Sequence, residues 1–354
     1  MWKIERYKKM WEMAVWCCML LGWTACDNDA AADQMPGDGL VQIQPVLSGS
    51  LVADGFGTGT RASLSGENGY KIVPLPEGTT LWIIAEKLDE TTGQVTSYSS
   101  AAYVVKEVSE GTGVTSLYPC EVDADGNVES IDGTPMLISE GNYIFWAVSP
   151  ARELGVGNTL SVKNGEELLA TDDRYEETKS TYIEVKGDWA NDESRIEVIR
   201  LKPLFNQTAQ LKFTITSEAK WIHSLELLAA GVEYSGLQEE TENNWSLTNH
   251  LNTDYGMKNG TYRETECVTG KNSDGTHYLE VTTPILPVNA VATPVVVLFN
   301  VLINGVPSPF SIMLTEKNFQ AGYSYHYKGT VKLQDGVAVI VWQFVEWNMD
   351  VVFD

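Results

Sequence analysis

The stretch YSYHYKGTVKLQDGVAVIVWQFV, residues 323–345, decides the fold class of this chain. Its first part, Tyr323–Leu333, is rich in tyrosine, valine and threonine, which favour β-strands. The pair Asp335-Gly336 then offers a hairpin turn, because such pairs reach positive φ at little cost. The run Val337–Val345 that follows is almost wholly apolar. The stretch therefore predicts two strands joined by a tight turn.

The same alternation of short strand and turn recurs along the whole chain. No long apolar stripe of helical period occurs, and the nearest helix candidate, Ser224–Ala230, is short. Short strands with frequent turns predict an all-β fold built from antiparallel β-sandwiches. Turn pairs stand at Asp125-Gly126, Asp132-Gly133, Asn164-Gly165, Asn259-Gly260, Asp274-Gly275 and Asn304-Gly305. The further strand-like segments are Leu81–Leu88, Ser97–Val108, Tyr143–Val148, Thr181–Val185, Ile196–Leu201, Ala209–Ile215, His277–Thr282 and Pro294–Ile303.

The polar, charged segment Lys186–Arg195 suggests a domain boundary, because a new strand pattern begins directly after it. The length of 354 residues also fits two domains of ordinary size. We therefore expect an N-terminal β-sandwich domain at 41–193 and a C-terminal one at 194–354.

The two ends of this body carry unusual strands. In the first, Val41–Val52, apolar Val41 and Ile43 alternate with glutamine, and Pro45 predicts a sheet edge or a bulge because it cannot donate a ladder hydrogen bond. The last, Val337–Val345, is apolar on both faces, and alternating Trp347, Met349 and Val351 extend it. Such a run needs cover on both faces, and left exposed it would promote aggregation.

The N-terminus reads as an export signal. A basic start is followed by Met13–Trp23, an apolar run too short to span a bilayer as a helix. The segment ends Trp23-Thr24-Ala25-Cys26, which resembles a bacterial lipobox in which Cys26 is lipidated; the alternative is an ordinary cleavage site. We thus expect a lipoprotein signal peptide at 1–25 and a flexible, acidic tether at 26–40.

Composition and motifs argue against several function classes. A net charge of −24 argues against a nucleic-acid partner, which needs clustered basic residues. No histidine, cysteine or carboxylate pattern has metal-ligand or catalytic spacing, so we expect no enzyme, metal or cofactor. Asp123, Asp125 and Asn127 could supply calcium ligands, but a hairpin turn is the simpler interpretation. Cys120 and Cys267 could form a disulfide or stay as buried thiols.

Residues 55–64, GFGTGTRASL, predict an exposed loop carrying a single arginine, Arg61. The loop lacks the Lys-Ser/Thr pair of a phosphate-binding loop and precedes no helix signal. Exposed loops rich in small residues are preferred sites of proteolytic cleavage. Cleavage between Arg61 and Ala62 would separate the first strand from the body.

Taken in order, these features resemble the fimbrillin family, the fimbrillin-like or Mfa-like pilus subunit lipoproteins of Bacteroidales-type bacteria. The resemblance rests on the signal with Cys26, the acidic tether, the first strand, Thr60-Arg61-Ala62, and the segments Leu75–Glu86, Gly141–Pro150, Ile196–Ile215 and Phe319–Gly336. It implies two tandem transthyretin-like β-sandwich domains, exported as an outer-membrane lipoprotein anchored through Cys26.

The resemblance also implies how such a subunit assembles. An Arg-specific protease would cut after Arg61, release the first strand and open a groove, which the C-terminal segment of a neighbouring pilus subunit fills. Alternatives are an uncleaved anchor or tip subunit of the same pili that binds a host glycan or protein, or a surface glycan-binding lipoprotein. The implied strand-exchange residues are Val41, Ile43 and Val46 in the released strand and Val337, Val339, Val341, Val345, Trp347, Met349 and Val351 in the donor.

Overall fold

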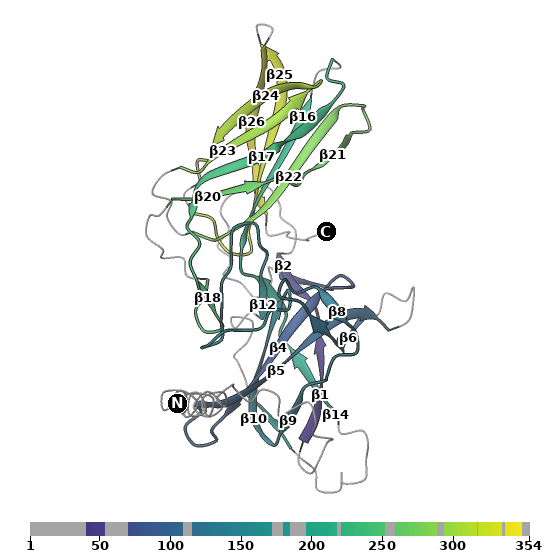
Figure 1. Cartoon of the computed structure of the whole chain (residues 1–354), viewed down its shortest axis with the longest axis vertical. Helices are drawn as coiled ribbons and strands as arrows, with labels where there is room; N and C mark the ends of the chain where they lie inside the picture. The colour runs from purple at the N-terminus through teal and green to yellow at the C-terminus, as the bar shows by residue number, and fades with distance from the viewer. Residues whose placement is uncertain are drawn as a thin grey trace, which may run out of the picture.

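The computed structural model describes a chain built from β-strands, drawn as two lobes along its long axis in Figure 1. The all-β fold class predicted from the sequence is confirmed. Among the residues described, no helix is long and apolar enough to cross a membrane. The described residues are 40–53, 70–108, 115–171, 180–184, 196–217, 221–251, 259–288, 294–316, 318–334 and 337–348.

The first lobe packs a large sheet against a small one. The large, nine-stranded sheet has the order β3-β2-β15-β12-β10-β4-β5-β6, with β13 paired to β10, and the small sheet has the order β14-β1-β9. Their strands alternate buried and outward-facing side chains, and the buried sets meet in one apolar core that includes Ile83, Tyr103 and Ile138.

The strand bounds in this lobe are as follows. The large sheet holds β2 (Ser50–Ala53), β3 (Tyr70–Val73), β4 (Thr80–Leu88), β5 (Val95–Glu107), β6 (Thr115–Pro119), β10 (Gly141–Ser149), β12 (Leu169–Thr171), β13 (Thr181–Ile183) and β15 (Leu204–Asn206). The small sheet holds β1 (Leu40–Leu47), β9 (Leu137–Ser139) and β14 (Ile196–Leu201). A separate ribbon pairs β7 (Glu121–Val122) with β8 (Val128–Ser130).

The second lobe is a sandwich of a five-stranded sheet, β21-β22-β16-β25-β26, and a four-stranded sheet, β20-β17-β23-β24. Phe213 lies at the centre of its core, with its ring centroid 5.1 Å from those of Phe299 and Tyr327 and 6.0 Å from that of Trp342. The strands are β16 (Ala209–Ser217), β17 (Leu225–Gln238), β20 (Asn259–Glu264), β21 (Val268–Lys271), β22 (His277–Ile285), β23 (Val296–Ile303), β24 (Val306–Met313), β25 (Ser324–Gln334) and β26 (Val337–Asn348). The short helix candidate at Ser224–Ala230 is therefore wrong, because Leu225–Ala230 begins strand β17.

The hairpin predicted from residues 323–345 is confirmed. β25 and β26 pair antiparallel from Gln334–Val337 at the turn to Ser324–Asn348 at the far end. Gly329 lies opposite Trp342 and leaves room for its ring, because a Cβ at Gly329 would lie 2.8 Å from Trp342 Cζ3. The glycine thereby lets the indole reach the core between the two sheets.

The two strands just after the predicted domain boundary pair with the first lobe. β14 pairs with β1, and β15 pairs with β2 and β12. The pairing changes to the second lobe only after Asn206, where β16 begins. Two tandem domains divided at 193 and 194 therefore remain a prediction, and the strand pairing favours a changeover about a dozen residues later.

The lobes are joined by an arm that leaves the second lobe between β17 and β20. It carries β18 (Trp245–Ser246) and β19 (His250–Leu251), which pair with each other, and β18 also pairs with β11 (Thr159–Leu160) in a three-stranded sheet. Trp245 is fully buried there among apolar residues of both lobes. Asn244 fixes the junction, since its side chain accepts from the Val162 N–H and donates to the Val162 carbonyl, each at 2.8 Å.

Removing the Trp245 side chain should therefore weaken the joint between the lobes. We expect Trp245→Ala to lower the free energy of unfolding by about 3–5 kcal/mol, because truncating a buried aromatic leaves a cavity. Chemical denaturation followed by circular dichroism measures this. Tyr98→Ala, at a side chain that is 60% exposed, is the control and should change stability by less than about 0.5 kcal/mol. Equal effects of the two variants would contradict the packing described.

Candidate functional site

The first strand of the described chain is a buried part of the first lobe. β1 is the middle strand of the small sheet: Leu40–Gln42 pair antiparallel with β9, and Gln42–Leu47 pair parallel with β14. Val41 and Ile43 are 0% and 1% exposed in the core, whereas Val46 points outward and is 41% exposed. Two of the three residues assigned to strand exchange in this segment thus fill the core.

Pro45 lies where β1 has a neighbour on one side only. The pairing with β9 ends at Gln42, and among the described residues the Ile43 N–H bond to the Met136 carbonyl, 2.9 Å, is the last backbone hydrogen bond on that side. At Pro45 the strand pairs with β14 alone. The prediction of an edge is therefore correct locally, although β1 as a whole is central to its sheet. Proline has no N–H to donate, and no ladder hydrogen bond is lost because no strand pairs with β1 on this side of Pro45.

Side chains of the large sheet satisfy the polar groups of β1. The buried Tyr103 hydroxyl donates to the Ile43 carbonyl at 3.2 Å and accepts from the Met136 N–H at 3.0 Å. Burial raises the pKa of Tyr103, so this hydroxyl stays protonated and can keep donating. On the open margin, the Gln44 side chain donates to the Leu117 carbonyl at 3.1 Å. Loss of β1 would leave these groups without those partners.

The predicted first strand, Val41–Val52, is in fact two strands in two sheets. The chain crosses from β1 to β2 at Ser48-Gly49. Gly49 has a φ of 130°, and a Cβ there would lie 2.0 Å from the Val73 carbonyl oxygen, so only glycine fits. β2 then pairs with β15 and β3, and β3 pairs with β2 alone among the strands described. A cut after Arg61 would therefore remove two strands and leave β3 without its partner.

Several predicted site residues lie outside the described residues. These are the lipid-attachment cysteine, the protease site and the end of the donor segment: Cys26, Arg61, Ala62, Met349 and Val351. Arg61 lies in the sequence between β2 and β3. The predicted scissile bond is thus flanked on its N-terminal side by the two strands that its cleavage would release.

The C-terminal strand β26 completes its own sheet as an edge strand. Its inward residues Ala338, Ile340 and Trp342 pack against the core of the second lobe. On its outer face, Val341 is 44% exposed and Val339 is half-buried. The apolar character on both faces that the sequence predicts is therefore present at these positions. Val337, Val345 and Trp347 also belong to β26, and only their backbone is described.

The neighbouring edge strand β24, which lies next to β26 across the sandwich, is protected against pairing. The two-residue turn Asn304-Gly305 makes Ile303 and Val306 a hydrogen-bonded pair. By alternation, Pro307 and Pro309 present their nitrogens to the free edge, where proline has no N–H to donate. β26 contains neither proline nor lysine. The edge of β26 is therefore the less protected of the two edges at this margin.

In the part of the chain that the structure describes, no cluster of side chains of metal-binding type occurs: no group of three or more histidine, cysteine or acidic side chains is placed to hold a metal. Thr214 Oγ1 donates to Glu280 at 3.1 Å and meets His326 Nε2 at 2.9 Å, so the hydroxyl lies between imidazole and carboxylate. A nucleophilic triad instead needs the imidazole in the middle. Burial lowers the pKa of His326, and the positive charges of Lys328 and Lys212 lower it further.

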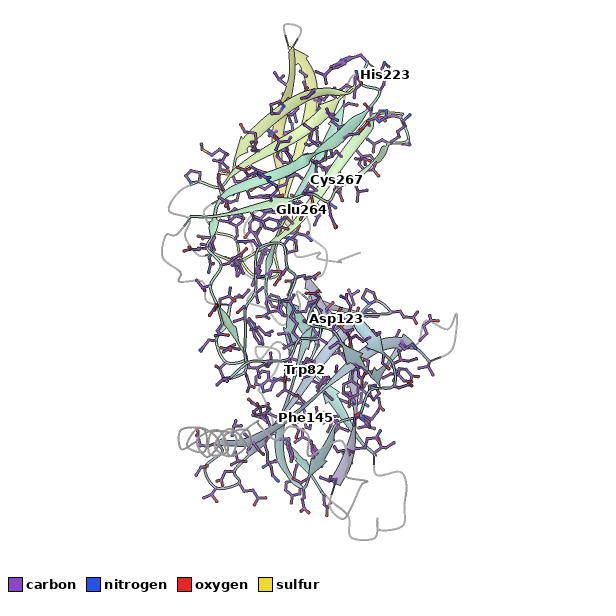
Figure 2. The ribbon with its side chains drawn as sticks, in the orientation of Figure 1. Trp82, Asp123, Phe145, His223, Glu264 and Cys267 are labelled. Atoms are coloured by element: carbon purple, nitrogen blue, oxygen red, sulfur yellow. The ribbon has the colours of Figure 1, made fainter. Side chains whose placement is uncertain are left out.

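The two cysteines and the acidic turn have structural roles. Cys120 and Cys267 are free thiols, and Figure 2 labels Cys267 in the second lobe beside Glu264. Burial raises the pKa of Cys120 to about 11, which keeps the thiol protonated and unreactive. Asp123 accepts from the Asn127 N–H at 2.8 Å and from the Asp125 N–H at 2.9 Å, as a hairpin turn requires. The hydrogen bond that the Asn127 side chain donates to Asp123 lowers the pKa of Asp123 the most, and the backbone hydrogen bonds lower it further.

Comparison with protein families gives a match to the fimbrillin-like model over residues 40–351. The chain belongs to the fimbrillin-like family. A crystal structure of a candidate cell adhesion protein from Bacteroides fragilis is 32% identical, with a TM-score of 0.69, over 88% of this chain and 99% of that one. A second candidate cell adhesion protein, from Bacteroides ovatus, covers 88% of this chain at 12% identity with a TM-score of 0.48. Comparison with curated protein sequences gave no match.

The fimbrillin-like family is a structural and adhesive family rather than an enzymatic one. Membership supports a pilus or adhesion subunit at the cell surface or in fimbriae, working with other pilus subunits. The sequence predicted strands at both ends of the body, but it did not predict that the chain passes from one sheet to the other at Gly49. The sequence feature that marks this change is the turn-forming tripeptide Ser48-Gly49-Ser50.

The contrast between Ile43 and Val46 tests the packing of β1. We expect Ile43→Ala to lower the free energy of unfolding by about 2–5 kcal/mol, because the side chain is buried in the core. Val46→Ala, in the same strand but at an outward position, should cost less than about 1 kcal/mol. Urea unfolding of both variants measures the difference. Equal and small effects would mean that β1 is not an integral core strand.

Proposed function

We propose that this fimbrillin-like chain is a pilus subunit, exported as a lipoprotein, cut after Arg61 and assembled by strand exchange in support of adhesion. The observation that carries the proposal is the placement of β1. It is buried in the core and pairs with β9 at its start and with β14 from Gln42 onward, yet it belongs to the segment that a single cut between β2 and β3 would free.

Departure of β1 and β2 would create a strong acceptor. Val41 and Ile43 would leave an apolar slot, and β9 and β14 would each lose their pairing along it. The cost of such an open state is high, because apolar surface and unpaired backbone groups are exposed together. An incoming strand with alternating apolar residues repairs both losses.

β26 has the properties of such a strand. It spans Val337–Asn348, and its outward residues Val339 and Val341 repeat the spacing of Val41 and Ile43. It is an edge strand, so leaving its own sheet breaks pairing with β25 only. Withdrawal would also remove Trp342 from Phe213 and Phe299. Exchange between subunits is therefore favoured only when the acceptor groove buries as much apolar surface of β26 as its own sandwich does.

Cleavage would also release the subunit from the membrane, because Cys26 lies in the part of the chain that is removed. One bond would then control both anchoring and polymerisation. A subunit that keeps its first strands would instead remain lipid-anchored with a closed first lobe, as an anchor or tip subunit would. The N-terminus of the assembled protein distinguishes these states.

Replacement of the arginine tests the proposal. We expect assembled wild-type protein to begin at Ala62, and Arg61→Ala to stay uncut, lipidated at Cys26 and unassembled. Mass spectrometry of surface-purified protein, with electron microscopy of fibres, measures both. Arg195→Ala, an arginine in another polar segment, is the matched control and should behave like wild type. Fibres whose subunits begin at Cys26 would overturn the cleavage step.

A further inference from the structure

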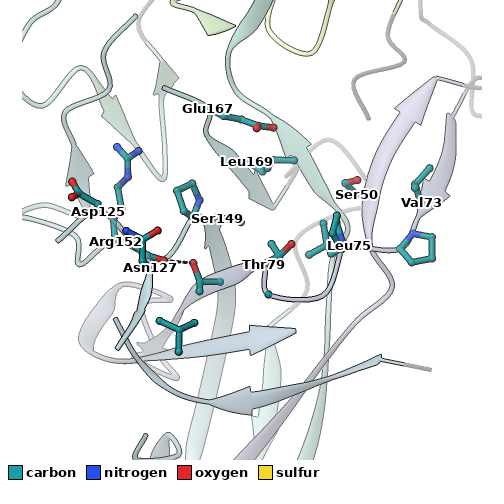
Figure 3. Close-up of a pocket in the computed structure, with 17 residues that line it drawn as sticks. Ser50, Val73, Leu75, Thr79, Asp125, Asn127, Ser149, Arg152, Glu167 and Leu169 are labelled. Atoms are coloured by element: carbon teal, nitrogen blue, oxygen red, sulfur yellow. Dashed lines mark hydrogen bonds between the residues drawn. The ribbon is translucent and has the colours of Figure 1, made fainter. Parts of the chain in front are cut away.

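A pocket of about 510 Å³ opens in the first lobe. It lies where β4 begins, β10 ends and β12 begins, and Figure 3 shows Arg152, Glu167 and Thr79 around it. The volume falls within the range of small-molecule sites, about 300–1,000 Å³. The strand-exchange elements do not use it, apart from Ser50 at one wall.

The lining combines hydrogen-bonding groups with short apolar walls. Hydroxyls come from Ser50, Thr79 and Ser149, while Pro74, Pro76 and Pro150 supply flat, rigid apolar surface. None of the described residues that line the pocket is aromatic. A ligand here would meet donors and acceptors on several sides, and carbon–hydrogen faces could lie against proline rings.

The charges of the pocket disfavour an anionic ligand. The guanidinium of Arg152 is already paired with Glu166 at 2.9 Å. Asp125, an exposed residue, adds a negative charge among the lining residues. Glu167 accepts from the Asn206 amide at 3.3 Å, and burial raises its pKa to about 8, so it is mostly protonated at neutral pH. The charged groups of the pocket are thus Arg152, whose charge is neutralised by Glu166, and the anionic Asp125. The neutral carboxyl of Glu167 can donate a hydrogen bond as well as accept one.

The wall beside Asp125 is fixed before any ligand arrives. The Thr80 hydroxyl donates to the Gly126 carbonyl at 2.6 Å and accepts from the Ala151 N–H at 3.0 Å. Gly126 has a φ of 85°, and a Cβ there would lie 2.7 Å from the Ala151 carbonyl oxygen. The turn is therefore held against the chain that leaves β10. A preformed site loses little conformational entropy on binding.

We propose that this pocket binds a neutral sugar residue of a glycan. Vicinal hydroxyls both donate and accept, which suits the mixture offered by Asp125, Glu167 and the pocket hydroxyls, and a pyranose ring fits the volume. The absence of an aromatic platform among the lining residues predicts weak binding of a single sugar, strengthened when many copies are displayed together. The proposal goes beyond the assembly role and concerns the uncut chain, because Ser50 of the lining lies in the part that cleavage would remove.

The test uses the full chain and simple glycosides. Saturation-transfer NMR with the methyl glycosides of glucose, galactose, mannose and N-acetylglucosamine should show transfer to at least one, and sialic acid should show none. Asp125→Ala should weaken the bound glycoside about tenfold, because a hydrogen bond to a charged group is lost. Asp132→Ala removes the same charge at an exposed position outside the pocket lining and should leave binding unchanged.

A second pair of variants tests whether hydrogen bonding by Glu167, rather than the volume of its side chain, is needed for binding. Glu167→Gln keeps a donor and an acceptor and should retain binding, whereas Glu167→Leu should lose it, with circular dichroism reporting the fold of each. No transfer to any neutral glycoside would overturn the proposal. So would a preference for sialic acid, or a glycoside affinity that Asp125→Ala leaves unchanged.

Discussion

The rest of the structure depends on the burial of β1 between β9 and β14. The small sheet has only these three strands, so its middle strand holds both neighbours in place. Val41 and Ile43 fill the core beneath, and the Tyr103 hydroxyl ties the strand to the large sheet. A strand so placed is normally permanent. Its position next to a predicted protease loop is what makes it a candidate for exchange, since removal opens a slot already shaped for a strand.

In the second lobe, the feature that matches the buried β1 is an edge strand, β26. β26 belongs to a well-packed sandwich, but it occupies the edge, while the adjacent edge strand β24 is protected by Pro307 and Pro309. The buried joint around Trp245 and Asn244 ties the arm of one lobe to the other. This joint fixes the arm of the second lobe against β11 and the apolar residues of the first lobe.

Much of this could be predicted from the sequence, for reasons visible in particular residues. Alternation and the Asp335-Gly336 pair indicated the β25–β26 hairpin, and composition indicated the all-β class. The boundary near 194 followed from local polarity, which cannot report that Ile199, Leu201 and Leu204 are buried in the first core. Pro45 indicated an edge, but the partners of β1 come from residues far along the chain. The pocket was not predicted either, because Ser50, Thr79, Asp125 and Glu167 meet only through the sheet topology.

Backbone hydrogen exchange at β14 and β9, in three states of the protein, tests most directly whether β1 is the strand that is exchanged. We expect slow exchange in the uncut chain, where β1 pairs with both strands. We expect fast exchange in the chain cut after Arg61, and slow exchange again in the assembled fibre, where a donor strand restores the pairing. Equal protection of β14 in the uncut and cut monomers, or a fibre in which β14 still exchanges fast, would contradict exchange of β1.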